Sequence, residues 1–462
     1  MNRFVSSLLA ASALLASGSW VGAAQAQTFT PSPGASPTMK AEILATEAID
    51  RVWSGHSVRF ALITTKTELV IGYYDANRQL TVARRRKSGG GWSYQKLDTW
   101  NDWDSHNYIA IAEDAVGRLH VAANMHSSPM TMFVSDPSGD VRTLKRVPVL
   151  VDPALERSAT YPVFLRDRAG RLIFKYRNGV SGAGDEIYDV LDAAAGKWSR
   201  LTSAPLVDGE GERNAYFMGP VVGPDNWFHI AWVWRETPMA ETNHDLSYAK
   251  SPDLIHWFRA DGTPLPLPIK LRDAEIVDPV PVKGGMINNN TLLGFDEQGR
   301  PMITYHKFDA AGDTQIYLAR YVGKASKTGW ERVQISQWKG YRWDFSGGGS
   351  LKSEIYVGGA QSIGGGLLKV PVIRLGQSID FIVRSSDLSL VEARPVFSLA
   401  DQLKTVVKTP EDMQVNIVNA EGDKGEVYAL VWNARPPQRD MAAPDIPDPT
   451  TLLFMTLRPQ PR

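Results

Sequence analysis

The sequence predicts an all-β fold, a seven-bladed β-propeller with four antiparallel strands in each blade. Three observations lead to this prediction. Short runs that alternate Val, Ile, Tyr, Phe or Trp with polar residues are typical of half-buried strands, and turn-forming clusters separate them. No stretch has the apolar periodicity of a long amphipathic helix. A unit with a short strand, an Asp/Gly turn, a second and third strand and a Trp-containing fourth strand recurs along the chain.

The second strand is the most recognisable part of this unit, and it occurs seven times after residue 57. Turns such as EDAVG, RDRAG, GPDN and DEQG precede it, as expected for tight hairpin connections. The seven strand cores are ELVIGYYD (68–75), GRLHVAANMH (117–126), GRLIFKYRNG (170–179), NWFHIAWVWR (226–235), GRPMITYHKFD (299–309), GGGLLKVPVIRL (364–375) and GEVYALVWNA (425–434). Seven four-stranded units can close radially into a ring that leaves few strand edges free.

The last unit ends after TLLFMTLRP (451–459), one strand short of four. The segment TEAIDRVWSG (46–55) precedes the first complete unit, and we expect it to supply the missing strand and close the ring. An eight-bladed ring or a β-sandwich is the structural alternative. We therefore expect a single β-propeller domain over residues 45–462.

The first 26 residues have the pattern of a secretory signal peptide. Arg3 provides the positive start, residues 4–15 the apolar run, and Ala-Gln-Ala at 24–26 the small-residue cleavage site. The apolar run is shorter than the roughly 18 residues that a membrane span needs, and no later segment qualifies. We expect export to the periplasm or out of the cell after cleavage. Residues 27–44 are rich in Pro, Ser and Thr and predict a flexible lead-in.

Composition narrows the function classes. The chain has no Cys, which excludes disulfide bonds and a zinc site built from thiolates. Lys and Arg number 50, as do Asp and Glu, and this balance argues against nucleic-acid binding, which usually shows a basic excess. A local basic patch could still bind a polyanion. The 14 Trp could be sugar-stacking platforms, but in a repetitive all-β chain we expect most of them inside the sheets.

Reactive side chains recur at equivalent positions of neighbouring units. In a propeller, the start of the first strand and the end of the second strand lie on the same face of a blade. Counted outward from the turns, these positions hold His106 and His126, Tyr161 and Arg177, Tyr216 and Arg235, and Asn289 and His306. The concave mouth of the ring is the expected ligand site. His120 and His229 fall in mid-strand instead, and we interpret them as hydrogen-bonded core histidines.

Several strings in these units resemble one known family, the BNR-repeat propeller polysaccharide lyases. This family includes ulvan lyases and the rhamnose–glucuronate lyases that act on gum arabic. The resemblance is strongest from Trp103 to Arg320, and its strings are WDSHNYI (103–109), NMH (124–126), TYP (160–162), YRNGVSGAGDE (176–186), NAYFMGP (214–220) and TNHDLSYAKSPD (242–253). The spacings of 20 residues from His106 to His126 and 16 from Tyr161 to Arg177 match the family's catalytic pattern.

The resemblance implies a polysaccharide lyase and assigns roles residue by residue. His106 and His126 correspond to the family's paired active-site histidines, and Tyr161 to its catalytic tyrosine. Arg177 corresponds to the arginine that neutralises the substrate carboxylate, and Tyr216 to a further tyrosine of some members. Further substrate or cation contacts are expected from Arg235, His244, Asn289 and His306. Members differ in bound metal, calcium or zinc, so a divalent cation such as calcium stays open and no metal ligand is carried over.

These residue types suit β-elimination across a uronic acid. The C5 proton is weakly acidic beside a charged carboxylate, and a bidentate Arg177 can neutralise that charge. A neutral imidazole can then remove the proton, while a phenol or a second imidazole protonates the leaving oxygen. We interpret His126 as the base and Tyr161 or His106 as the acid. The expected partner is an anionic uronate polysaccharide with rhamnose–glucuronate linkages, as in ulvan or arabinogalactan side chains, and the expected oligomeric state is a monomer.

Two other functions remain open from the sequence. A sialidase-like glycoside hydrolase would need a nucleophilic tyrosine, a nearby Glu and several arginines, but it would leave the paired histidines without a task. A non-catalytic glycan-binding propeller would use the same mouth without turnover. The Gly-rich string SGAGD (181–185) predicts either a loop that approaches substrate or a tight turn.

Overall fold

The computed structural model describes residues 41–349 and 351–460, which form an all-β structure of antiparallel sheets. The predicted signal peptide and residues 27–40 lie outside the described residues. Strand β1 (Ala41–Val52) already begins within the predicted lead-in, ahead of the expected domain start at residue 45. Helical segments in the described ranges are short: α2 (Leu399–Val406), η1 (Val141–Thr143), η2 (Ala240–Thr242), η3 (Leu271–Asp273), η4 (Gly323–Ala325) and η5 (Asp423–Gly425).

Three sheets follow one another in the first half of the described chain. The first contains β2 (Ala61–Thr64), β3 (Glu68–Tyr74), β4 (Gln79–Arg86) and β5 (Ser93–Trp100). The second contains β6 (Ala110–Glu113), β7 (Leu119–Ala122), β9 (Met132–Val134) and β10 (Lys145–Val147). The third contains β8 (His126–Ser128), β11 (Ala159–Arg166), β12 (Leu172–Val180), β13 (Ala183–Asp192) and β14 (Lys197–Arg200), in this spatial order.

Three further sheets complete the structure. One contains β15 (Asn214–Val222), β16 (Phe228–Arg235), β17 (Asn243–Ser251), β18 (Trp257–Phe258), β19 (Pro264–Leu265) and β20 (Glu275–Asp278). A nine-stranded sheet joins β21 (Leu292–Phe295), β22 (Pro301–Phe308), β23 (Thr314–Tyr321) and β24 (Trp330–Gln334) to β25 (Ile355–Val357), β26 (Gln361–Gly364), β27 (Leu367–Arg374), β28 (Gln377–Arg384) and β29 (Leu390–Pro395). The last contains β30 (Gln414–Glu421), β31 (Val427–Ala434), β32 (Thr450–Pro459) and β1.

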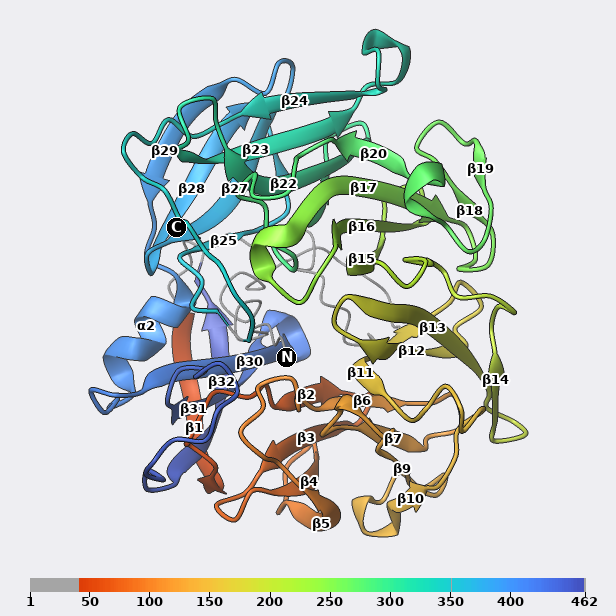
Figure 1. The fold of residues 1–462 in the computed structure, drawn as a ribbon. Coiled ribbons are helices and arrows are strands. Elements are labelled where there is room, and N and C mark those ends of the chain that lie inside the picture. The colour runs from red at the N-terminus through yellow and green to blue at the C-terminus, as the bar shows by residue number, and fades with distance from the viewer. Residues whose placement is uncertain (1–40, 350, 461–462) are drawn as a thin grey trace.

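Each of the seven predicted strand cores forms a strand that is second in its antiparallel run. These strands are β3, β7, β12, β16, β22, β27 and β31. GRLHVAANMH does so only in part, since β7 covers Leu119–Ala122 and His126, expected at the end of this strand, begins β8 of the next sheet. Figure 1 shows the sheets arranged around a common centre, with β2, β6, β11 and β15 near it and β5, β10, β14 and β24 farther out. The predicted all-β class and the order of strands within the repeat are therefore confirmed.

An aspartate shapes the turn that precedes several of these strands. Asp114 Oδ1 accepts hydrogen bonds from the backbone N–H groups two and four residues later, at 3.0 and 2.9 Å. Gly117 then adopts a φ of 94°, a conformation that favours glycine because it has no Cβ. Asp167 and Asp296 repeat the same two contacts. The Asp/Gly turns seen in the sequence are thus hairpin connections between the first and second strands.

The side chains inside the sheets include large aromatic rings and two histidines that are hydrogen-bonded to aspartates. Trp232, Trp234 and Trp330 are among the largest fully buried side chains, as expected for Trp in the sheets. His120 is buried with its Nε2 3.1 Å from Asp114 Oδ2. His229 is buried between Asp225 and Tyr248, with ring nitrogens 3.0 and 2.6 Å from their oxygens. The interpretation of the two histidines as hydrogen-bonded core residues is confirmed.

The first and last strands of the described chain pair with each other. β1 runs antiparallel to β32, from Ala41 opposite Pro459 to Val52 opposite Thr450. The pairing expected for residues 46–55 is therefore present at 46–52, and it gives the last sheet its fourth strand. Within residues 41–349 and 351–460, none of the helices has the length and apolar character that crossing a membrane requires.

Candidate active site

A rigid turn between β5 and β6 positions the first two functional side chains. Asp102 Oδ1 accepts a hydrogen bond from the Asp104 backbone N–H at 2.9 Å, and Asp104 Oδ1 accepts one from the His106 N–H at 2.8 Å. The Tyr74 hydroxyl donates to the Asn107 carbonyl at 2.5 Å from the neighbouring sheet. Such aspartate-to-backbone contacts hold a turn without regular secondary structure. Hydrogen bonds therefore hold Asp104 and His106 in place on this loop.

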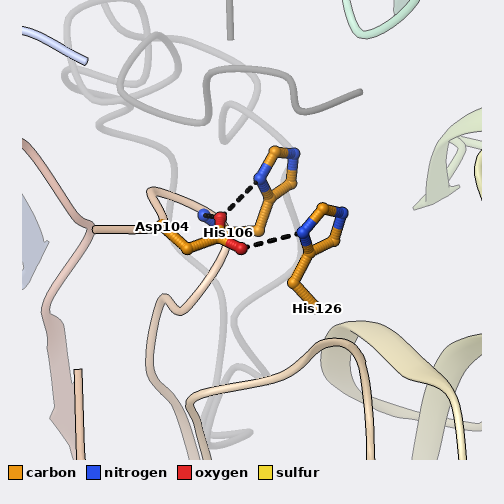
Figure 2. A group of neighbouring side chains, drawn as sticks. All are labelled: Asp104, His106 and His126. Atoms are coloured by element: carbon orange, nitrogen blue, oxygen red, sulfur yellow. Dashed lines mark hydrogen bonds and ion pairs between the residues drawn. The ribbon is translucent and has the colours of Figure 1, made fainter. Parts of the chain in front are cut away.

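Asp104 joins the two predicted histidines (Figure 2). Its Oδ1 lies 2.9 Å from His106 Nδ1 and its Oδ2 lies 2.8 Å from His126 Nδ1. The two imidazole rings stack nearly parallel, with centroids 4.2 Å apart and planes inclined by 11°. Both Nδ1 atoms face the carboxylate, and both Nε2 atoms point away from it. The spacing of 20 residues thus brings the pair together, as the sequence predicted.

Main-chain pairing brings His126 to the next two predicted residues. His126, on β8, lies opposite Thr160 on β11, and Thr160 lies opposite Arg177 on β12. The register of β11 shifts between Thr160 and Val163, and Tyr161 in this bulge has a φ of 60°. A non-glycine residue in the left-handed region is strained, and bulges often redirect side chains next to active sites. The bulge gives Tyr161 a direction that a regular strand would not.

The Tyr161 ring contacts both a histidine and the arginine. Its ring centroid is 5.7 Å from that of His106, and the Arg177 Cζ lies 5.0 Å from the same centroid. Arg177 is buried and donates from Nη2 to Ser127 Oγ at 3.2 Å and Thr160 Oγ1 at 3.1 Å. Its Nε has no hydrogen-bond partner among the described residues. A buried guanidinium with an unused N–H is suited to bind an anionic ligand.

A second tyrosine and arginine lie next to this group. The Arg235 Cζ is 5.4 Å from the Tyr216 ring centroid, and the Tyr216 hydroxyl is 2.5 Å from Ser181 Oγ. Arg235 also donates to the Thr237 and Pro238 carbonyl oxygens, so its guanidinium helps to hold the loop after β16. The Tyr216 and Arg235 positions predicted from adjacent units are therefore in contact with each other.

The charged and aromatic neighbours change the acidity of these groups. Burial would raise the pKa of Asp104, but hydrogen bonds from His106 and His126 outweigh it and hold the pKa far below its usual range. Burial and the neighbouring His106 ring lower the pKa of His126 to about 4. Asp104 is thus an anion and His126 a neutral base near pH 7.

The two tyrosines shift in opposite directions. Burial raises the pKa of Tyr161 well above its usual value, although Arg177 opposes this effect. Burial acts on Tyr216 too, but Arg235 and Arg177 outweigh it and lower the pKa of Tyr216. Tyr161 therefore keeps its proton at neutral pH, which suits a proton donor.

The three side chains of Figure 2 also form a possible donor set for a cation. One carboxylate oxygen and the two imidazole nitrogens lie within 4.8 Å of one another. Calcium prefers six to eight oxygen ligands, so a site with two imidazoles does not fit it. Each Nδ1 already has a carboxylate oxygen at hydrogen-bond distance, and we assign the cluster to hydrogen bonding.

Three predicted contact residues have other surroundings. His244, on β17, has its Nε2 2.7 Å from Glu236 Oε1 and its Nδ1 3.0 Å from Asp245 Oδ2. His306 is 1 % exposed and packs against Trp343, with ring centroids 5.2 Å apart. This environment is that of a core residue and does not support the expected substrate contact. Asn289 is half-buried in a loop, with a φ of 61°.

The sequence reasoning missed Asp104 and Ser181, which contact the predicted residues directly. Asp104 is part of the string WDSHNYI, but aspartate is common in turns and nothing in the sequence places it between two histidines. Ser181 lies in SGAGD, whose first two residues form the tight turn between β12 and β13 and whose last three begin β13. Of the two interpretations of this string, the tight turn is confirmed. The Ser181 hydroxyl in this turn is hydrogen-bonded to the Tyr216 hydroxyl.

The chain matches one protein-family model and is similar to several solved structures. The model of a BNR repeat-containing family matches residues 70–338. The structure of the polysaccharide lyase Uly1 is similar, with 14 % identity, a TM-score of 0.58, and coverage of 87 % of this chain and 90 % of that one. A PL25 ulvan lyase gives 12 % identity, a TM-score of 0.59, and coverage of 89 % and 95 %. No curated protein sequence matches the chain.

Proposed function

Because the chain belongs to the BNR repeat-containing family, we propose that it is a polysaccharide lyase. The observation that supports this proposal best is the contact series Asp104–His106/His126–Tyr161–Arg177. It unites a base, a proton donor and a buried cation, which are the three elements that β-elimination beside a carboxylate requires. The fold shared with two lyases is compatible with this chemistry.

We propose the following division of roles. Arg177 binds the uronate carboxylate and offsets the charge that develops when C5 loses its proton. His126 Nε2 takes that proton, and the C5–H electron pair forms the C4=C5 double bond. The C4–O bond breaks with its electrons on oxygen, and the Tyr161 hydroxyl protonates this oxygen. Exchange with solvent then removes the added proton from His126 and returns a proton to the Tyr161 oxygen.

The fold proposal is a seven-bladed β-propeller of four-stranded blades. Dividing the nine-stranded sheet at its one parallel pair, Phe295 with Gln361, leaves seven antiparallel runs. The pairing of β1 with β32 supports a ring whose last blade combines both ends of the chain. In such a ring the residues of the site come from the second, third and fourth blades, so the site lies off-centre.

For the substrate, we propose a uronate glycan with rhamnose–glucuronate linkages. The PL25 ulvan lyase has been solved bound to -[GlcA(1-4)Rha3S]-, which contains this linkage. The buried guanidinium of Arg177 is suited to bind the carboxylate of such a uronate. We also propose that the protein is exported and acts as a monomer.

The test is a digestion of uronate glycans, with the ultraviolet absorbance of the unsaturated uronate product as readout. We expect absorbance on at least one glycan with rhamnose–glucuronate linkages. The variants His126→Ala and Arg177→Ala should lose about 10²- to 10⁴-fold in kcat/KM, because a general base or charge stabiliser contributes about that much. His256→Ala is the matched control, since His256 is exposed and lies outside the site.

Two outcomes would contradict the proposal. New reducing ends without absorbance would indicate a sialidase-like hydrolase. Glycan binding that survives in both variants, without any turnover in the wild type, would indicate a binding propeller.

A further inference from the structure

Asp104 is the central residue of the histidine pair. It is 2 % exposed, and each of its carboxylate oxygens lies within 2.9 Å of a different imidazole Nδ1. Oδ1 also accepts the His106 backbone N–H, which fixes the rotation of the carboxylate. One buried side chain therefore sets the orientation of both rings.

This arrangement determines where the imidazole protons lie. An ionised carboxylate only accepts hydrogen bonds, so each Nδ1 that faces it must carry a hydrogen. A neutral imidazole has one N–H, and its other nitrogen then has a free electron pair. His106 and His126 consequently both present Nε2 as an acceptor, away from Asp104 (Figure 2). In this state both histidines are bases, and neither can donate a proton from Nε2.

The close stacking limits how many protons the pair can take up. The ring centroids are 4.2 Å apart, so two imidazolium ions would repel each other strongly in this buried position. One carboxylate offsets one positive charge. The cluster can therefore hold one additional proton at zero net charge, and a second one would be costly.

We propose that Asp104 is a positioning residue that makes His106 and His126 a two-base unit for a single proton. This inference rests on the proposed lyase function and sharpens it. It gives a structural reason why Tyr161, and not His106, has the role of acid proposed above. The C5 proton moves to Nε2 of the unit, and the leaving oxygen receives its proton from the Tyr161 hydroxyl.

The variant Asp104→Asn tests the inference with little change in shape. An Asn side chain offers one oxygen acceptor and one NH₂ donor in place of two acceptors. The Asn oxygen should stay at the Oδ1 position, where it accepts the His106 backbone N–H, so its NH₂ group faces His126. His126, the proposed base, must then accept at Nδ1 and carry its hydrogen at Nε2, where it can no longer act as a base. We expect kcat to fall about 10²- to 10⁴-fold. The KM should stay within about threefold, because Asp104 is not assigned a contact with substrate.

The pH dependence gives a second readout. The Asp104 charge and hydrogen bond raise the pKa of His126 against the effect of burial. Without that charge, the acid limb of the kcat/KM profile should move to lower pH. A side chain with only a structural role would lower activity without moving this limb.

Nitrogen–proton NMR provides a readout that is independent of activity. The chain has eight histidines, so the imidazole signals can be assigned by single substitutions. We expect Nδ1–H tautomers for His106 and His126 in the wild type, and one Nε2–H tautomer among the two in Asp104→Asn. If the wild type shows Nε2–H for either ring, the inference is wrong.

A matched control is available in the same sheet region. Asp114 is also buried and also contacts a histidine, with Oδ2 3.1 Å from His120 Nε2. Asp114→Asn should lower the melting temperature, because Asp114 also holds its turn, and it should leave kcat and the pH profile unchanged. Equal kinetic effects in the two variants would overturn the inference.

The remaining outcomes separate the inference from the proposed function. A wild type that releases no unsaturated product from any uronate glycan contradicts the lyase function itself. An active wild type with an unchanged Asp104→Asn variant contradicts only the role of Asp104. Loss of wild-type activity with a chelator, restored by zinc and absent in Asp104→Asn, would replace the hydrogen-bonded unit by a metal site.

Discussion

His306 illustrates how position within a repeat differs from accessibility at the residue scale. Its place at the end of β22 is equivalent to that of Arg177 on β12 and Arg235 on β16, and this equivalence suggested a substrate contact. In the structure Trp343, from the long segment between β24 and β25, packs on the His306 ring. The position of a residue in a strand predicts the direction of its side chain. It does not predict whether a residue from a distant loop packs on that side chain.

The buried position of His306 predicts a pH-dependent contribution to stability. Burial lowers its pKa from 6.5 to about 4 in the folded protein. Between these values the unfolded chain binds a proton that the folded protein does not, so the unfolding free energy falls as the pH falls. Relative to His306→Leu, the wild type should lose about 1.4 kcal/mol per pH unit in this window.

The measurement is denaturant unfolding of both proteins from pH 7 to pH 4. The difference between them should change with pH mainly below 6.5, the ordinary histidine value. A difference that stays constant over the whole range would show that His306 is protonated to the same extent in both states.

At the scale of elements, a hairpin and a bulge determine the geometry of the site. The two-residue turn after β12 lets Gly184 on β13 face the Arg177 side chain. A Cβ built at Gly184 would lie 2.8 Å from Arg177 Cδ and 3.0 Å from Cγ. The SGAGD string therefore has a specific physical role, which is to leave room for the arginine.

Gly184→Ala should displace the Arg177 guanidinium from its contacts with Ser127 and Thr160. We expect kcat/KM to fall about 10-fold or more, since small misplacements of a charge-stabilising group are costly. The melting temperature should fall somewhat, because the Arg177 side chain can move aside but the Asn178 carbonyl oxygen, 3.1 Å from the added Cβ, belongs to the backbone. Gly91→Ala is the control, as its added Cβ meets nothing within 4 Å. Full activity in Gly184→Ala would contradict the assigned role of Arg177.

Some strand positions of the site residues could be predicted from the sequence, and the bulge at Tyr161 could not. The spacing of two strands around an Asp/Gly turn placed Tyr161 and Arg177 on the paired strands β11 and β12, as predicted. His126 was expected at the end of the preceding unit's second strand, but it lies on β8, which pairs with β11 of the next sheet. The bulge at Tyr161 could not be predicted, since TYP offers no sign that its tyrosine adopts a positive φ. Asp104 lies in a loop and its partner His126 lies on β8, 22 residues later, so no local pattern joins the two.

At the scale of the whole molecule, the pairing of β1 with β32 joins the two ends of the described chain. Leu452, Phe454 and Leu457 on β32 are buried, and β1 covers this strand along its length. Without this pairing, β32 would be an exposed edge. We infer that stability depends on keeping the two ends together.

A disulfide across this pair should stabilise the protein. Ala45 lies opposite Thr456, and the chain has no other Cys to interfere. The double variant Ala45→Cys/Thr456→Cys should gain about 2–4 kcal/mol in unfolding free energy when oxidised, because the cross-link restricts the unfolded chain. The comparison is thermal unfolding of the oxidised and reduced forms, with Ala45→Cys alone as control. An oxidised form that is no more stable would contradict the native pairing of these residues.

Local sequence patterns predict the repeat, and with it the strand order and the residues that share equivalent positions. Strand alternation and Asp/Gly turns are local properties, so they can be read from neighbouring residues. Tertiary structure decided which of these positions act together. Asp104 links two histidines from different segments, Trp343 covers His306, and β1 reaches β32 from the other end of the chain. These contacts depend on how distant segments pack, and no local pattern specifies them.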